Sequence, residues 1–162
     1  MPDEIEKRVE QYQGDKKLDL ESCLGAGTQG SVFVFNNPLQ SRRVAVKFHQ
    51  QEIAYQRERD VYLRLNELEI VEVHAHEVPQ LIDFDDELLA LEMTIVSPPF
   101  VLDFGGAYLD RPPDYSPEVW ADWRAMKSEA FEGNWPAVQQ ILAEFESYGI
   151  YVADLNPGNI KF

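Results

Sequence analysis

The chain of 162 residues is 44% hydrophobic and 12% aromatic, which is enough for one globular domain with a core and short for two full domains. Its 29 acidic residues outnumber its 14 basic residues and give a formal net charge of −15. This charge repels phosphate backbones and anionic lipid headgroups, so it argues against nucleic acid and membrane surfaces as partners.

The sequence carries no sign of an extracellular or membrane protein. Cys23 is the sole cysteine, so an intramolecular disulfide is excluded. The acidic N-terminal segment lacks a signal-peptide core, and no apolar run is long enough to cross a bilayer. We therefore expect a cytoplasmic protein.

The first part of the chain predicts one helix and three strands. A short helix is expected to end at Gly14 and Asp15. Alternating apolar residues predict strands at 18–24, 31–35 and 44–48. The apolar face of the helix consists of Ile5, Val9 and Tyr12.

From Gln51 the apolar period changes from two to 3.6 residues, which predicts a second helix. Glu58 is the anomaly of its buried face, because an unpaired carboxylate among apolar side chains costs roughly several kcal/mol. The sequence therefore predicts a cation beside Glu58. The face as a whole consists of Ala54, Glu58, Val61, Tyr62, Leu65 and Leu68.

The second part of the chain predicts two more strands, an irregular connector and two helices. The strands cover 78–84 and 88–95, and the connector, rich in proline and glycine, covers 97–115. Ser116 begins one helix as its N-cap, and Asn134 begins the other. The last residues are expected to form a loop. The glycines expected to end the two helices are Gly133 and Gly149.

Three glycines lie between the first two predicted strands, in the segment GAGTQGSV. A GxGxxG pattern alone fits either a structural hairpin or a nucleotide cradle. A dinucleotide-binding loop needs a helix after the glycines, and here a strand follows. A Walker loop needs Lys followed by Ser or Thr directly after the last glycine, and that pair is absent. What remains is a glycine-rich hairpin, which lets backbone N–H groups approach phosphate oxygens.

This hairpin, the strand after it and the Glu58 helix together resemble the protein-kinase-like superfamily. The segment Val44–Lys47 (VAVK), which includes Ala45, matches the third-strand lysine motif. The resemblance implies that Lys47 neutralises Glu58 and supplies positive charge at the nucleotide phosphates. The residues that match the motif GxGxxGxV are Gly25, Gly27, Gly30 and Val32.

The segment DLNPGN near the end of the chain resembles the kinase catalytic loop, and most closely the version found in aminoglycoside and other small-molecule kinases. The resemblance implies that Asp154 orients or deprotonates the acceptor hydroxyl and that Asn159 holds a magnesium ion. The alternative is a simple Asn-Pro-Gly turn after a helix.

The segment LLALEMTIV resembles the fifth strand and hinge of the family, where backbone groups of Glu92, Met93 and Thr94 would hold an adenine ring. The resemblance implies an α+β, protein-kinase-like fold in one compact unit. Residues 1–96 would form an N-terminal lobe, a five-stranded antiparallel sheet with one packed helix. Residues 97–162 would form a reduced helical C-terminal part that ends in the catalytic-type loop.

The chain also departs from the family pattern. DFG occurs at 103–105, before the catalytic-type loop instead of after it; we interpret it as a coincidental acidic turn, with Asp103 as a metal ligand the less favoured alternative. Val152 and Ala153 stand where His and Arg are usual, and Asn156 replaces a lysine aimed at the transferring phosphate. These losses weaken the stabilisation of transition-state charge.

Two other patterns give weaker predictions. His74 and His76 alternate, but no clear third ligand accompanies them and His49 is distant in sequence, so a solvated strand or loop is favoured over a metal site. The three tryptophans are expected to be core or partner-facing residues, since the acidity of the chain disfavours base stacking. They are Trp120, Trp123 and Trp135.

The leading hypothesis is a minimal kinase-like domain that binds ATP and magnesium through Lys47, Glu58, Asp154 and Asn159, and whether it transfers phosphate slowly is left open. One alternative is a non-catalytic pseudokinase, a binding or regulatory module that would meet a protein partner or a second copy through an uncovered helical face. Another is a small-molecule phosphotransferase.

Overall fold

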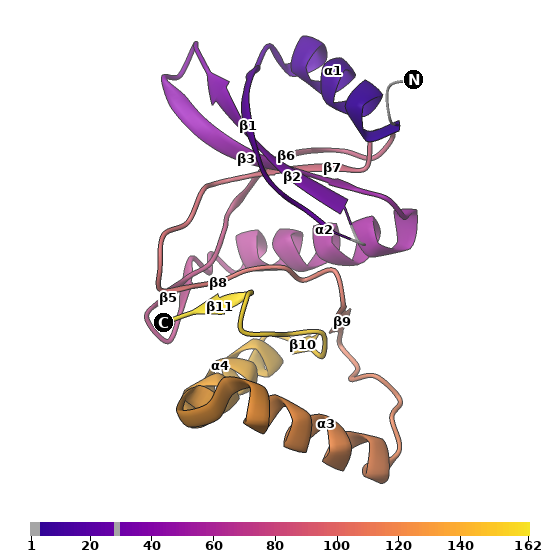
Figure 1. Cartoon of the computed structure of the whole chain (residues 1–162), viewed down its shortest axis with the longest axis vertical. Helices are drawn as coiled ribbons and strands as arrows, with labels where there is room; N and C mark the ends of the chain where they lie inside the picture. Colours follow the sequence, from indigo (N-terminus) through magenta and orange to yellow (C-terminus); the bar gives the residue numbers. More distant parts are fainter. Residues whose placement is uncertain (1–3, 28–29) are drawn as a thin grey trace.

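The computed structural model describes residues 4–27 and 30–162 (Figure 1). In this part of the chain the largest sheet is antiparallel and has five strands in the order β1-β2-β3-β7-β6. The predicted α+β class and five-stranded antiparallel sheet are thus confirmed. The strands are β1 (Asp19–Ala26), β2 (Gly30–Asn37), β3 (Arg42–His49), β6 (Leu81–Asp85) and β7 (Ala90–Met93).

Helices cover the two faces of this large sheet, with α1 (Glu4–Lys16) on one side and α2 (Glu52–Glu67) on the other (Figure 1). The alternation of β3 explains this, because successive side chains point to opposite faces. Val44, Val46 and Phe48 pack in one apolar cluster with α1, whereas Ala45 belongs to the cluster on the α2 side.

The first helix ends later than predicted. It passes through Gly14 to Lys16, and the chain then turns at Lys17, which has a positive φ of 55°. Glycine in a helix costs only about 1 kcal/mol relative to alanine, and the buried face on α1 outweighs that cost. The N–H of Leu18 donates to the carbonyl of Gln13, which closes the helix.

The second helix and the two later helices follow the predicted pattern with small differences. Leu68, expected on the buried face of α2, is exposed just beyond the end of that helix. Ser116 caps α3 (Pro117–Phe131) by accepting the N–H of Val119 at 3.2 Å. A 3-10 turn, η1 (Glu132–Asn134), joins α3 to α4 (Trp135–Ser147), so α3 ends before Gly133.

Short strands occur in the connector and in the last residues, both of which were expected to be irregular, and also between α2 and β6. β9 pairs with β10, and β11, β8, β5 and β4 form a small sheet in that order. Strands of two or three residues are too short to show a periodic pattern in the sequence. Such segments are extended because they pair with other strands in the fold. They are β4 (Glu72–Val73), β5 (His76–Glu77), β8 (Phe100–Val101), β9 (Ala107–Leu109), β10 (Ile150–Val152) and β11 (Ile160–Lys161).

One apolar cluster passes through both parts of the chain and includes Tyr62 of α2, Phe104 of the connector and Phe145 of α4. β5 (His76–Glu77), which the sequence assigned to the N-terminal lobe, pairs with β8 of the second part. Among the described residues, no helix combines the length and the apolar character needed to span a bilayer.

Polar contacts join α1 to the large sheet. The buried hydroxyl of Tyr12 donates to Oε1 of Glu92 at 2.8 Å. The guanidinium of Arg8 donates to the carbonyls of His49 and Leu88, each at 2.8 Å. Burial raises the pKa of Glu92 even though Tyr12 opposes the shift.

Replacing Tyr12 by Phe is expected to lower the free energy of unfolding by about 1–3 kcal/mol, because the buried Glu92 loses a donor that no water replaces. Urea denaturation followed by circular dichroism measures this. The control is Tyr115→Phe, since Tyr115 is 39% exposed, and it should change stability little. Equal free energies of unfolding for the two variants would contradict the expected contribution of the Tyr12 hydrogen bond to stability.

Candidate functional site

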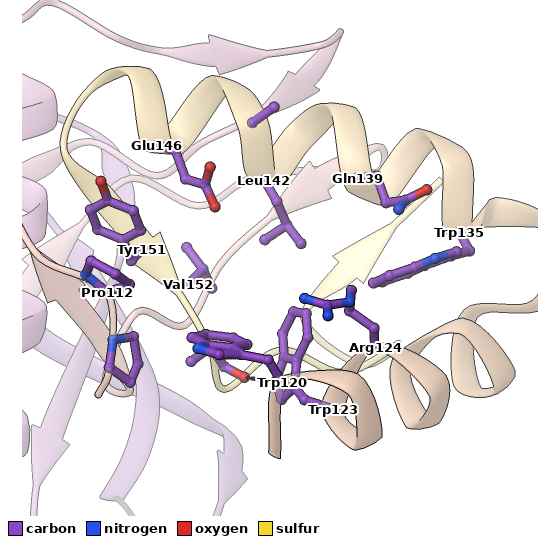
Figure 2. A pocket seen from close by; sticks show the side chains of 13 residues that line it. Pro112, Trp120, Trp123, Arg124, Trp135, Gln139, Leu142, Glu146, Tyr151 and Val152 are labelled. Atoms are coloured by element: carbon purple, nitrogen blue, oxygen red, sulfur yellow. Dashed lines mark hydrogen bonds between the residues drawn. The ribbon is translucent and has the colours of Figure 1, made fainter. Parts of the chain in front are cut away.

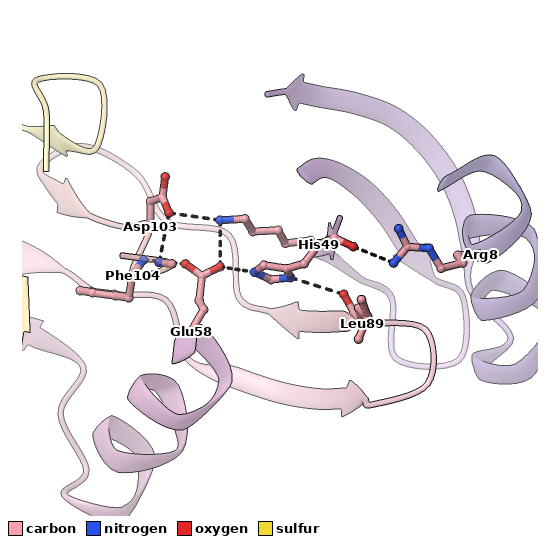
Figure 3. A network of polar contacts seen from close by, with 8 residues as sticks. Arg8, His49, Glu58, Leu89, Asp103 and Phe104 are labelled. Carbon is pink, nitrogen blue, oxygen red and sulfur yellow. Dashed lines mark hydrogen bonds and ion pairs between the residues drawn. The ribbon is translucent and has the colours of Figure 1, made fainter. Parts of the chain in front are cut away.

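The centre of the site is the carboxylate of Glu58, which is 0% exposed. Its Oε1 lies 2.8 Å from Nζ of Lys47 and 2.8 Å from Nε2 of His49. Its Oε2 accepts the backbone N–H of Phe104 at 2.5 Å (Figure 3). The predicted cation beside Glu58 is therefore present, and it is Lys47.

Local structure explains why these groups meet. Lys47 and His49 are two residues apart on β3, so their side chains leave the same face of the sheet. Gln50 and Gln51 alone separate β3 from α2, and this short connection places Glu58 beneath that face. Nδ1 of His49 faces the carbonyl of Leu89 at 3.4 Å.

Electrostatics favours the charged forms of this pair. Burial raises the pKa of Glu58, but Lys47 and His49 outweigh burial and hold that pKa at about 2. Burial likewise lowers the pKa of Lys47, and the carboxylates of Glu58 and Asp103 more than compensate. The ion pair is thus ionised at neutral pH.

A cavity of about 780 Å³ opens beside the ion pair, between the large sheet and the second part of the chain. Almost all of the residues proposed from sequence line it, together with Asp103, which the sequence analysis had set aside. A Cβ at Gly25 or Gly27 would meet no atom within 4 Å, so these glycines leave open space at the cavity. The proposed residues in the lining are Gly25, Gly27, Gly30, Val32, Ala45, Lys47, Glu58, Met93, Thr94, Asp154 and Asn159.

Gly30 differs from the other two glycines. Its Cβ would lie 2.1 Å from the carbonyl oxygen of Phe48, so the close approach of β2 to β3 requires glycine there.

Glu92 is the exception among the proposed lining residues. Along β7 the side chains alternate, so Glu92 points to Tyr12 on the α1 side of the sheet while Met93 faces the cavity. The strand end that lines the cavity is Met93–Val96. The lining from this strand therefore begins at Met93, whereas the prediction for Glu92 concerns its backbone groups.

Asp103 was expected to lie in a coincidental acidic turn, and the structure corrects this. Its Oδ1 lies 3.2 Å from Nζ of Lys47, and its side chain lines the cavity. Its backbone has a positive φ of 73°, a conformation that costs energy outside glycine. Phe104 beside it is fully buried between the rings of Tyr62 and Phe145.

Strand pairing brings the Asp103 segment to the catalytic-type loop although the two are far apart in sequence. β8, just before Asp103, pairs with β11, just after the loop; β9, just after Asp103, pairs with β10, just before the loop. The N–H of Leu102 donates to the carbonyl of Asn159 at 2.9 Å. Gly106 packs so closely on Asp154 that an added Cβ would lie 2.3 Å from the Cβ of Asp154.

The histidine pair of the sequence analysis lies elsewhere. Nε2 of His74 is 3.5 Å from Oε1 of Glu144, and Nδ1 of His76 lies 2.8 Å from the carbonyl of His74. The described residues hold no group of three or more His, Cys, Asp or Glu side chains arranged for a metal ion. A divalent ion in the cavity would therefore need the amide of Asn159 and oxygens of a bound ligand beside the carboxylates.

A second cavity, of about 420 Å³, lies between α3 and α4 (Figure 2). All three tryptophans of the chain line it, and each is half-buried. They were expected to be core or partner-facing residues, and they form the wall of this apolar cavity. Its lining continues to Val152 and Ala153, directly before Asp154.

Comparison with known proteins gives no family for this chain. No family model matches it, and no curated protein shows significant sequence similarity to it.

The contribution of Glu58 to stability is expected to fade in acid. Its pKa is about 2 in the folded chain against 4.5 for an ordinary glutamate, so its stabilisation is complete above pH 4.5 and is lost as the pH falls from 4.5 towards 2. The difference in unfolding midpoint between wild type and Glu58→Gln should narrow below pH 4.5 in urea titrations.

Glu52→Gln is the matched control, because Glu52 is exposed in the first turn of the same helix. It should stay close to wild type from pH 7 to pH 3. A constant gap between wild type and Glu58→Gln over that range would contradict the assignment of Glu58 as an ionised buried partner.

Proposed function

We propose that this chain is a minimal kinase-like domain that binds ATP with magnesium in the cavity beside Glu58. The observation that carries the proposal is the buried ion pair of Lys47 and Glu58, which fixes an ammonium at the cavity 3.2 Å from the carboxylate of Asp103. An ammonium held in place by a buried carboxylate is a preorganised partner for phosphate oxygens.

The triphosphate would lie between Lys47 and the glycine-rich segment. Gly25 and Gly27 leave open space at the cavity, so backbone N–H groups can approach phosphate oxygens without side-chain clash. Gly25 lies in β1 and Gly30 begins β2, and these two strands pair with each other, which fixes both ends of the glycine-rich segment.

The adenine ring would occupy the apolar end of the cavity. Val32 and Ala45 line it from the large sheet, and Met93 lines it from the end of β7. A flat aromatic ring fits between such side chains, and the backbone of the Met93–Val96 segment supplies polar groups at its edge.

Magnesium would be held by Asp103 and Asn159 together with phosphate oxygens. Magnesium in nucleotide sites is bound by one or two carboxylates plus phosphates, with waters completing its shell. Asp103 and Asn159 both line the cavity, and the Leu102–Asn159 hydrogen bond keeps their segments adjacent. This arrangement supplies an aspartate from the DFG segment even though DFG precedes the loop in sequence.

Asp154 would meet the acceptor hydroxyl. It lines the same cavity, and Leu155 and Ala153 on either side of it are buried, which leaves Asp154 exposed at the loop surface. A carboxylate at that place can accept the proton of an attacking hydroxyl. The proposed reaction transfers the γ-phosphoryl group of ATP to that hydroxyl and releases ADP.

One observation favours a second candidate, a nucleotide-binding module without catalysis. Asn156 lines the cavity where the resembled loop has a lysine, and its side chain accepts the N–H of Gly158 at 2.8 Å. The loop therefore lacks a cation for the charge that develops during transfer. Nucleotide binding by wild type without turnover would favour this module over an enzyme.

Mg-ATP at 100 times its Kd is expected to raise the wild-type free energy of unfolding by about 2.7 kcal/mol. Lys47→Met should weaken binding at least about tenfold, because a hydrogen bond to a charged group contributes about 1.5–3 kcal/mol. Titration with a fluorescent ATP analogue measures the affinity, and circular dichroism checks folding. Lys7→Met, on the exposed side of α1, is the control.

Because Lys47→Met also removes a partner of buried Glu58, Ala45→Leu serves as a second variant that fills the cavity and leaves the ion pair intact. It should weaken binding of the adenine nucleotide as well. Wild type that binds no adenine nucleotide with magnesium or manganese would overturn the proposed function.

Asp103→Asn is expected to weaken the contribution of the metal ion to ATP binding and to spare the contribution of the nucleotide itself. With saturating magnesium the ATP affinity should fall about tenfold or more, because a charged ligand of the metal is lost. Without metal it should stay equal or rise, since a carboxylate that repels phosphates is gone. Asp114→Asn, at an exposed position outside the cavity, should change neither affinity. Equal loss in both conditions would contradict the assignment of Asp103.

A further inference from the structure

Two side chains of α3 contact the loop that carries Asp154. Nε1 of Trp123 donates to the carbonyl of Ala153 at 2.8 Å, and Nζ of Lys127 donates to the carbonyl of Leu155 at 2.6 Å. These two carbonyls belong to the residues directly before and after Asp154. From this geometry we infer that Trp123 and Lys127 are positioning residues that fix Asp154 at the cavity.

The spacing of the two donors suits this role. Trp123 and Lys127 are four residues apart on α3, so they lie on the same face of the helix one turn apart. The helix therefore presents two donors to two nearby carbonyls of the loop backbone. With both neighbouring carbonyls held by α3, the Asp154 side chain is left on the other side, where it lines the cavity.

The rest of the loop is held by other contacts. The carbonyl of Asn156 accepts the N–H of Asn159 at 2.9 Å, and the carbonyl of Asn159 accepts the N–H of Leu102 at 2.9 Å. These bonds order residues 156–159. Val152 and Ala153 have apolar side chains that cannot donate a hydrogen bond, so the donors at the start of the loop come from α3.

The indole of Trp123 is itself fixed by its neighbours (Figure 2). Its ring packs edge to face against Trp120 at 5.5 Å between centroids and against Trp135 at 6.2 Å. Such packing restricts the side-chain rotamers, so the indole N–H is directed to Ala153 before any ligand binds. The tryptophan side chains that line the cavity between α3 and α4 thus hold the Asp154 loop on the side opposite the Glu58 cavity.

This inference rests on the proposed function for its chemical meaning, and it goes beyond it by assigning residues that touch neither nucleotide nor acceptor. The nucleotide contacts through Lys47, Ala45 and Met93 come from the large sheet. Loosening the Asp154 loop should therefore change the transfer step and leave nucleotide binding by the sheet in place.

The test compares Trp123→Phe and Lys127→Met with Trp120→Phe. Trp120→Phe keeps an aromatic ring against Trp123 and removes an indole N–H that makes no hydrogen bond within the described residues, so it is the matched control on the same helix. Trp123→Phe keeps an aromatic ring and removes the donor. Lys127→Arg restores a donor and should recover part of what Lys127→Met loses.

Two measurements are expected to agree. Hydrogen exchange of the backbone amides of residues 153–159 should become about tenfold faster or more in Trp123→Phe and Lys127→Met but not in Trp120→Phe. In the same variants kcat should fall about tenfold or more while the KM for ATP stays within about twofold. For a wild type that binds nucleotide without turnover, hydrogen exchange in the loop is the readout that decides.

Each result decides the inference. A uniform loss of protection across the whole chain, or equal changes in Trp120→Phe, would show a merely structural role and overturn it. Unchanged exchange in the loop would overturn it as well. If wild type binds no nucleotide, the proposed function fails by itself, and local exchange in the loop still decides whether α3 positions Asp154.

Discussion

The structure depends on one buried charge. A carboxylate removed from water must be paired and hydrogen-bonded, or its desolvation costs several kcal/mol by order of magnitude. Glu58 meets this requirement with Lys47 and His49 from β3 and with the backbone N–H of Phe104 from the connector. Three segments that are separate in sequence, namely β3, α2 and the connector, are therefore held at one point. The cavity lies beside that point because Lys47, which pairs with Glu58, also reaches Asp103.

Segments that are far apart in the sequence lie side by side in the fold. The segment around Asp103 and the loop around Asp154 lie side by side because β8 pairs with β11 and β9 pairs with β10. Each of these pairs joins two strands that are not adjacent in sequence. Strand pairing fixes the relative position of two loops irrespective of how the chain connects them, so residues that are far apart in sequence can line one site.

Sequence reasoning succeeded where local periodicity determines structure. The strands of the large sheet and the α2 helix follow from periods of 2 and 3.6, and burial of Glu58 required the cation that Lys47 supplies. It failed where partners are distant. The adjacency of Asp103 comes from pairing of short strands, and the contact of Trp123 with Ala153 comes from packing of α3. The resemblance to a hinge concerned the backbone of Glu92, so it did not predict that the Glu92 side chain pairs with Tyr12 on the other face of the sheet.

The charges of the cavity oppose a bound triphosphate unless a metal ion accompanies it. Among the described residues that line it, Lys47 is the one basic side chain, whereas Glu58, Asp103 and Asp154 are acidic. The ammonium of Lys47 is already shared between Glu58 and Asp103. A bare triphosphate would therefore enter a cavity whose formal charge is negative, on a chain of net charge −15. A divalent cation between the carboxylates and the phosphates reverses this repulsion, since each anion then contacts the cation and not another anion. On this basis the proposed binding of nucleotide and the proposed binding of metal at this site would be one coupled event.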